Sequence, residues 1–195
     1  MTLTAVHAQS AREVLDKTAG LITQSGGVKA KFKVTQFNGT TENGATTGTM
    51  WLQGRKFKMD TPDMITWFDG HTEWTMLKGS NEVNVSEPTE AEQQAINPYT
   101  FINIYKKGYA LSLKESTLRG KPTYVVSMRA KRKRAISNVI VDVDRNTFVP
   151  LCIRALRDGD WVRLAILSFS SGNTSESTFT FPASDYPNAE VIDLR

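Results

Sequence analysis

The sequence predicts a mainly β protein of the α+β class, with one strongly curled antiparallel sheet of about eleven strands and helical cover. Three observations favour this fold. Apolar residues recur at helical spacing near the N-terminus, short alternating segments separated by turn signals fill most of the chain, and a helical stretch interrupts them near residue 90. An open sheet of this size would expose two edges and an apolar face, so we expect it to curl.

The N-terminal helix is predicted over residues 10–25. Ser10 and Glu13 have the S-x-x-E spacing of a capping box, and Gly26 and Gly27 favour an end of the helix. From Val28 the apolar residues alternate with lysines and Thr35, which is typical of a strand with one buried face.

The rest of the chain alternates between short strands and turns, apart from one helical interruption. Residues 38–44 are expected to form a loop, and two short helices are expected over residues 89–96 and 97–108. The remaining strands are expected at residues 46–53, 56–61, 64–68, 72–77, 82–86, 110–117, 123–130, 136–144, 148–156, 161–170 and 177–181.

Length and composition favour one domain, and the first residues favour export. The chain has 195 residues and 39% hydrophobic residues, and it contains no apolar run long enough to cross a bilayer. We interpret residues 1–9 as the end of a removed signal peptide or as a disordered N-terminus, because Val6-His7-Ala8 resembles a signal-peptidase site. Residues 10–195 are then a single domain. The lone Cys152 excludes an internal disulfide and a zinc site with a second thiol.

The sequence contains no recognisable catalytic or metal-binding motif. His71 is the one histidine outside the predicted leader, and no G-x-S-x-G sequence accompanies it. Asp142 and Asp144 begin like a calcium loop, but Thr147 and Ile153 stand where that loop requires glycine and glutamate. We therefore expect no enzymatic activity, no metal and no cofactor.

A run of basic residues is predicted to occupy the tip of a hairpin. A net charge of +4 is compatible with anionic partners but lies below that of a dedicated nucleic-acid-binding protein. The run either docks on a partner or a membrane or is a solvated turn that opposes aggregation. The interleaved aromatic residues that stack on bases do not occur there, so no nucleic acid is expected. The cations are Arg129, Lys131, Arg132, Lys133 and Arg134.

Several strands in the first half carry large apolar residues on both faces. Trp51 lies between Met50 and Leu52, and Trp67 lies beside Phe68. An antiparallel strand with one solvated face would alternate more cleanly. The pattern allows two interpretations: a densely packed core between sheet and helices, or a curled sheet with an apolar lining.

Five segments resemble the LolA family of periplasmic lipoprotein carriers. The first is GTMWLQGRKFKM at residues 48–59, and the second is FDGHTEW at residues 68–74, an Asp-Gly turn that leads into an aromatic strand. NPYTFI at residues 97–102 is similar to the lid segment of the family. STFTFP at residues 177–182 and VIDLR at residues 191–195 are similar to its closing strand and tail.

The resemblance implies an incomplete antiparallel β-barrel with a helical lid and an apolar interior. Such a protein would be a periplasmic monomer that carries the acyl chains of lipoproteins from an inner-membrane lipoprotein-releasing transporter to an outer-membrane acceptor. The family often has Arg-Pro after the tryptophan strand, where this chain has Gln53-Gly54-Arg55 without a proline. Arg55 is therefore the candidate for latching the lid.

Twelve apolar residues are candidates for binding acyl chains, and they come from the first helix, the strands and the lid. The alternative function is a periplasmic lipid- or peptide-sensing domain of the same fold, which would use the groove or the basic hairpin without transport. The candidate lining residues are Leu15, Ile22, Phe32, Val34, Trp51, Met59, Trp67, Trp74, Met76, Phe101, Ile104 and Tyr105.

Overall fold

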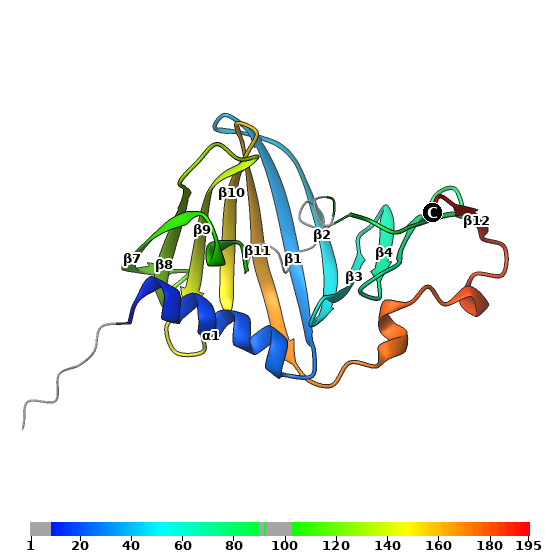
Figure 1. Cartoon of the computed structure of the whole chain (residues 1–195), viewed down its shortest axis with the longest axis horizontal. Coiled ribbons are helices and arrows are strands. Elements are labelled where there is room, and N and C mark those ends of the chain that lie inside the picture. Colours follow the sequence, from blue (N-terminus) through cyan, green and yellow to red (C-terminus); the bar gives the residue numbers. More distant parts are fainter. Residues whose placement is uncertain (1–8, 90–91, 93–102) are drawn as a thin grey trace, which may run out of the picture.

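The structure is a computed structural model that describes residues 9–89, 92 and 103–195 (Figure 1). The α-helix whose bounds lie among these residues is α1 (Ala11–Gln24), and Glu92 and Asn103 are also α-helical. Three short 3-10 helices are η1 (Ile104–Lys106), η2 (Glu176–Phe179) and η3 (Ala183–Asp185). The strands are β1 (Val28–Asn38), β2 (Thr41–Gln53), β3 (Lys56–Asp60), β4 (Met64–Phe68), β5 (Glu73–Leu77), β6 (Glu82–Ser86), β7 (Tyr109–Leu118), β8 (Lys121–Ala130), β9 (Ile136–Asp144), β10 (Pro150–Arg157), β11 (Asp160–Ser171) and β12 (Glu190–Asp193).

Helix α1 begins and ends where the sequence predicts. The Glu13 backbone N–H donates to Ser10 Oγ at 3.2 Å, and the Ser10 backbone N–H donates to Glu13 Oε2 at 2.7 Å, so the capping box is complete. Gly26 and Gly27 follow the helix with φ of +69° and +138°. A Cβ on Gly27 would lie 2.3 Å from Thr174 Oγ1, so glycine lets the chain turn closely into β1. No helix among the described residues is long and apolar enough to span a bilayer.

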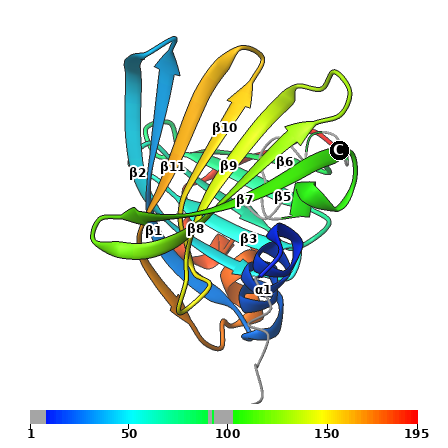
Figure 2. The ribbon, with the colours of Figure 1, turned by 90° about the vertical axis from the view of Figure 1, so that its left-hand side faces the viewer.

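All twelve strands belong to one sheet, in the order β12-β6-β5-β4-β3-β2-β1-β11-β10-β9-β8-β7. Neighbours are antiparallel except β12, which pairs in parallel with β6. The edges β12 and β7 do not pair with each other, so the sheet stays open. Figure 2 shows the strands curving past α1, which lies against one face. We call the face toward α1 the inner face and the opposite one the outer face.

The prediction of a curled sheet that does not close is confirmed. Two of the predicted segments differ in the structure. Residues 38–44 are not a loop: β1 and β2 extend to a tight turn at Gly39–Thr40, with Asn38 opposite Thr41. Residues 177–181 are not a strand, because Thr178 N–H donates to the Ser175 carbonyl within η2 and Phe179 is fully buried. The edge of β6 is instead paired with β12, a strand that the sequence analysis did not predict.

The helical lid is not shown by the structure. Of the two helices expected over residues 89–108, most of the first and the start of the second, including Phe101, lie outside the described residues. The described end of the second consists of Asn103, which is α-helical, and the 3-10 turn η1, and Gly108 follows with a φ of +85°. The chain then enters β7.

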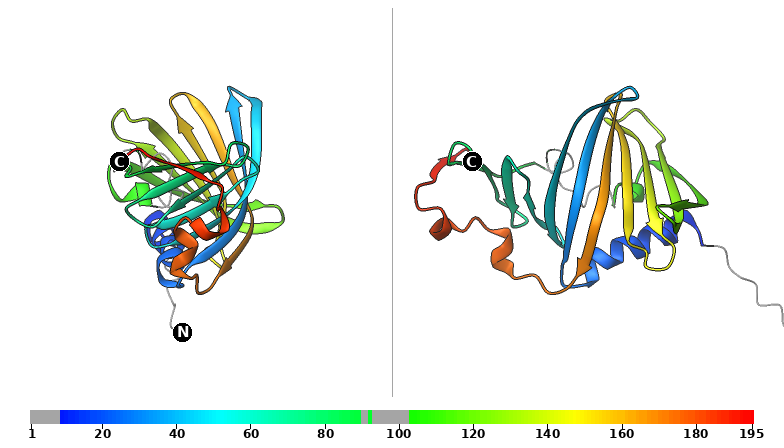
Figure 3. Two further views of the ribbon diagram at one scale, coloured as in Figure 1. Left: turned by 90° about the vertical axis from the view of Figure 1, so that its right-hand side faces the viewer. Right: turned by 180° about the vertical axis from the view of Figure 1, so that it is seen from behind.

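Three groups of buried apolar residues hold the sheet. The first group lies on the inner face of β7–β10 and includes Val14 and Leu15 of α1. The second lies on the inner face of β1–β4 and β11 and includes Ile22 of α1. Leu164 of β11 packs against both groups and joins them into one apolar surface. The third lies on the outer face of β4–β6 beneath the C-terminal segment that follows η2, which Figure 3 shows passing beside these strands.

Candidate functional site

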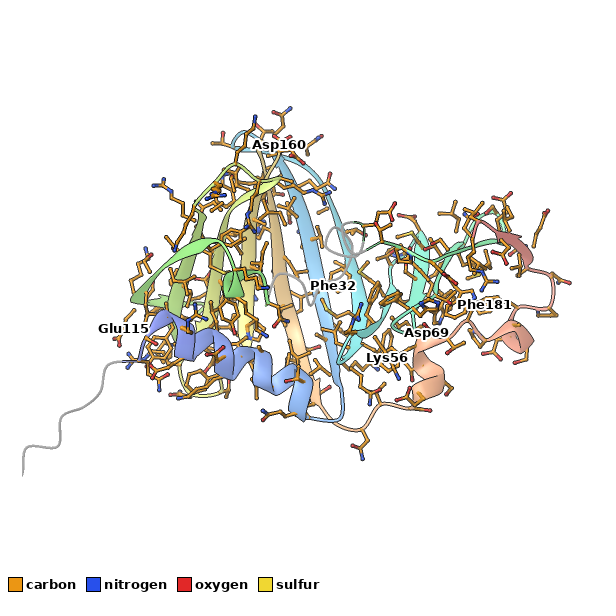
Figure 4. The ribbon with its side chains drawn as sticks, viewed as in Figure 1. Phe32, Lys56, Asp69, Glu115, Asp160 and Phe181 are labelled. Carbon is orange, nitrogen blue, oxygen red and sulfur yellow. The ribbon has the colours of Figure 1, made fainter. Side chains whose placement is uncertain are left out.

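The inner face is the best candidate for a binding site, because strand alternation and one glycine shape it. Val28, Ala30 and Phe32 of β1 are all buried there. Phe32 lies opposite Gly48 of β2, and a Cβ at Gly48 would come within 2.7 Å of Phe32 Cζ. Glycine is therefore required beneath this ring. Figure 4 shows Phe32 near the middle of the sheet.

Helix α1 covers only part of this surface. It crosses one end of the strands and ends close to the start of β1 (Figure 1), while β1 continues away from it. Val34 and Leu164 point to the same face farther along the strands, and Met59 lies on this face two strands away from Ala30. All three are only half-buried. The inner face thus combines a closed core under α1 with an apolar surface that is partly open.

Tyr105 anchors the end of the segment that precedes β7 to the helix. Its ring is fully buried in the inner-face group, and its Oη donates to Asp16 Oδ1 of α1. The Arg12 guanidinium lies 5.8 Å from the ring centroid. The sequence predicted Tyr105 as a lining residue but did not single out Asp16, because a solvent-side acid on an amphipathic helix has no distinguishing pattern.

A second anchor joins Gly108 to the basic hairpin. Arg134 Nη1 donates to the Lys107 carbonyl at 3.4 Å, and its guanidinium lies 5.3 Å from the Tyr109 ring centroid. A Cβ on Gly108 would lie 2.2 Å from Arg134 Nη2. Tyr109 Oη donates to the Ile136 carbonyl at 2.7 Å, and burial raises the pKa of this tyrosine. Arg134 therefore has a structural role at the entry to β7.

The inner face becomes polar toward β5. Glu73 lies opposite Phe68 on this face, and burial raises the pKa of its carboxyl. Its Oε2 is buried without a hydrogen-bond partner, and the charge of Glu92 raises the pKa further. The apolar surface is thus bounded by the carboxyl group of Glu73, and burial favours the neutral form of this group.

The structure divides the predicted lining residues between the two faces. Trp51 points outward between two lysines, and the other three outward-facing residues, Trp67, Trp74 and Met76, belong to the outer-face group under the C-terminal segment. Phe181, which Figure 4 places in that segment, meets Trp67 edge-to-face at 5.4 Å. The large residues on both strand faces therefore serve two separate surfaces. The described members on the inner side are Leu15, Ile22, Phe32, Val34, Met59, Ile104 and Tyr105.

The other predicted binding residues lie at turns. Arg55 is exposed in the turn between β2 and β3, where nothing tests its role as a latch. The basic run does lie at the hairpin between β8 and β9, with Arg129 near the end of β8 and the other four cations in the turn, and all five are exposed. Among the described residues, no acidic side chain forms an ion pair with Arg129, Lys131, Arg132 or Lys133.

Nothing in the described part of the chain resembles a catalytic or metal centre. No group of three metal-ligating side chains occurs there. His71 is exposed and lies 3.3 Å from Glu87. Burial raises the pKa of the Cys152 thiol, which disfavours the reactive thiolate. The inner face therefore offers apolar contact and shape rather than reactive groups.

Comparisons with known proteins agree with this architecture. A family model described as outer membrane lipoprotein carrier protein LolA matches residues 1–160. No curated protein matches the sequence significantly. An uncharacterized conserved protein from Thermus thermophilus is similar in structure, with a TM-score of 0.64, 16% identity, and coverage of 95% of this chain and 99% of that chain. LprF from Mycobacterium bovis is also similar, with a TM-score of 0.52, 10% identity, and coverage of 88% and 96%.

Proposed function

This chain belongs to the LolA family of outer membrane lipoprotein carrier proteins, and on that premise we propose that it binds the acyl chains of lipoproteins on its inner face and carries them between membranes. The observation that supports this most directly is the half-buried apolar surface beyond α1, formed by Val34, Met59 and Leu164. This apolar surface continues the closed core, because Leu164 packs against both inner-face groups. An alkyl chain bound there can therefore extend the packing that is already present.

The energetics suit a carrier. Each CH₂ buried from water contributes about 0.8 kcal/mol, so one long acyl chain left in water would cost on the order of 10 kcal/mol. A surface of aliphatic, methionine and phenylalanine side chains supplies this burial without requiring a fixed orientation, and methionine adapts well to varied shapes. Release then depends on a limited affinity rather than on a chemical step.

The proposed lining is the inner-face subset of the predicted residues. One end of the proposed lining is closed by Leu15 and Ile22 of α1 and by Tyr105. Its floor is formed by Phe32, Val34 and Met59. We propose that Ile104 of η1, which packs against the first inner-face group, completes the lining at the closed end. Arg55 stays the proposed latch.

The partners and location are proposals of the same kind. We expect residues 10–195 to act as one carrier domain in the periplasm. There it would receive lipoproteins from an inner-membrane transporter and deliver them to an outer-membrane acceptor. The exposed cations Arg129, Lys131, Arg132 and Lys133 are positioned to dock on an acidic donor surface.

Titration with a triacylated lipopeptide tests the proposed function. We expect saturable binding to the detergent-free protein, and native mass spectrometry should record a defined mass increment. Val34→Glu and Met59→Glu each place a charge on the half-buried floor and should abolish binding while the protein stays folded, because burying an unpaired carboxylate opposes the acyl chain.

Thr47→Glu is the matched control. Thr47 lies opposite Lys33 on the outer face of the adjacent strand, so the same charge there should leave binding unchanged. Equal binding by all three folded variants would show that the acyl chain does not use the inner face. Absence of any lipopeptide binding by the unmodified protein would refute the carrier function.

A further inference from the structure

The outer face of β1 to β3 carries a row of lysines. Lys29, Lys31 and Lys33 alternate with inner-face residues along β1, so all three side chains lie on the outer face, and their Cα atoms are roughly 7 Å apart along the strand. Lys29 and Lys31 are exposed, and Lys33 is half-buried. Lys58 of β3 projects from the same face two strands away.

Trp51 of β2 lies between these lysines. The register places Trp51 opposite Lys29 on one side and Lys58 on the other. Both ammonium nitrogens lie 5.2 Å from the Trp51 ring centroid. These cation–π contacts hold the half-exposed indole ring of Trp51 between the two ammonium groups.

The acidic groups around this face are already paired. Asp60 is bound by Lys78 at 2.8 Å, Glu176 is bound by Lys56, and Glu42 is bound by Arg163 at 2.9 Å. Among the described residues, Lys29, Lys31, Lys33 and Lys58 form no ion pair. The face therefore keeps four positive charges that nearby carboxylates do not neutralise.

A polar hollow opens beside the row. Its volume is about 330 Å³, and it lies where β11 leaves the sheet. Lys29 and Trp51 form one side of it. The other side is rich in hydroxyl and amide groups, from Ser170, Asn173, Thr174 and Thr178. An ammonium group beside several hydrogen-bond donors suits a phosphate with an attached polar group.

We propose that this outer face docks on a bilayer that contains anionic phospholipids, with one headgroup in the hollow beside Lys29 and Trp51. Lysines attract an anionic membrane surface, and tryptophan is enriched at the depth of the headgroups. Leu167, which is 53% exposed, is the unpaired residue of the β11 bulge opposite Lys31 and Phe32. The sheet separates this face from the inner one, so docking leaves the inner face accessible.

Vesicle sedimentation tests the docking face. The whole protein should partition onto phosphatidylcholine vesicles that contain phosphatidylglycerol and not onto phosphatidylcholine alone, and added salt should weaken the partition. Each lysine near such a surface contributes about fivefold, so Lys31→Gln with Lys33→Gln should weaken partition about 25-fold. Lys31 is exposed, Lys33 is half-buried, and both lie on the face opposite the inner-face core, so thermal unfolding should change little.

The matched control is Lys131→Gln with Lys133→Gln, which removes the same charge from the hairpin. An equal loss in this control would show that net charge, not the β1 row, binds the membrane, and would overturn the proposal. Partition onto phosphatidylcholine alone, or no loss in the β1 variant, would also overturn it. Binding to polyglutamate without binding to vesicles would assign the face to an acidic protein and refute a membrane role.

Tryptophan quenching locates the contact. Brominated phosphatidylglycerol should quench fluorescence of the bound protein, and Trp51→Phe should remove most of this quenching. Trp161→Phe, which removes a half-buried tryptophan at the start of β11, should leave it intact. Quenching that persists in Trp51→Phe would contradict the placement of Trp51 at the membrane.

Discussion

Replacing Trp67 by alanine should detach the C-terminal segment and cost more stability than the same change at any other described tryptophan. Trp67 is 1% exposed and meets Phe181 at 5.4 Å and Tyr186 at 6.0 Å, both edge-to-face. Truncation of a buried tryptophan costs about 3–5 kcal/mol, and these aromatic contacts favour the upper part of that range. At about 2–4 °C per kcal/mol for a domain of this size, the melting temperature should fall by roughly 10 °C.

Denaturant unfolding and limited digestion with proteinase K, which has broad specificity, measure the two effects. The freed segment should become sensitive to cleavage between residues 182 and 190, because the packing of Phe181 and Tyr186 against Trp67 is lost. Trp51→Ala is the control, since this indole is half-exposed, and it should cost below about 1 kcal/mol and leave the segment protected. Equal losses in the two variants, or continued protection in Trp67→Ala, would refute the view that Trp67 holds the segment.

Three further predictions concern stability. Gly48→Ala should cost about 1–3 kcal/mol in urea unfolding, because its Cβ would lie 2.5 Å from the Asp60 carbonyl and 2.7 Å from the Phe32 ring. Burial raises the pKa of Glu73, so ionisation of its carboxyl group opposes folding above the ordinary pKa of 4.5. Glu73→Gln should therefore raise the melting temperature at neutral pH, and this gain should vanish in acid. In the unmodified protein Arg154 Nη2 lies 2.9 Å from the largely buried carboxylate of Asp142. Asp142→Ala should therefore cost about 1–3 kcal/mol by calorimetry, because Arg154 loses its partner. An unchanged melting temperature in any of the three variants would count against the stated cause.

Local patterns were enough to locate most elements. The capping box at Ser10 and Glu13 and the glycine pair after α1 are short-range signals, and the structure forms both as predicted. Alternation along residues 28–34 predicted a half-buried strand, which became the inner face of β1. Such patterns succeed because period and capping depend on neighbours within one or two turns of chain.

The pairing of segments far apart in sequence could not be predicted in the same way. The alternating aromatic residues near Phe179 resemble a strand, but their rings pack on β4, and the parallel edge beside β6 is filled by β12 instead. Nor could alternation tell which side of β4 faces α1: Phe68 joins the inner group and Trp67 the outer one.

The amino-acid sequence was therefore sufficient to predict the class of fold, the helix at its start, most strands and the apolar character of their faces. Those properties follow from the period of side chains along a local backbone. The folded chain alone shows that Trp51 lies among lysines, that Tyr105 reaches Asp16, and that Leu164 joins two cores. These contacts depend on register and on sheet curvature, which are set by the packing of segments far apart along the chain.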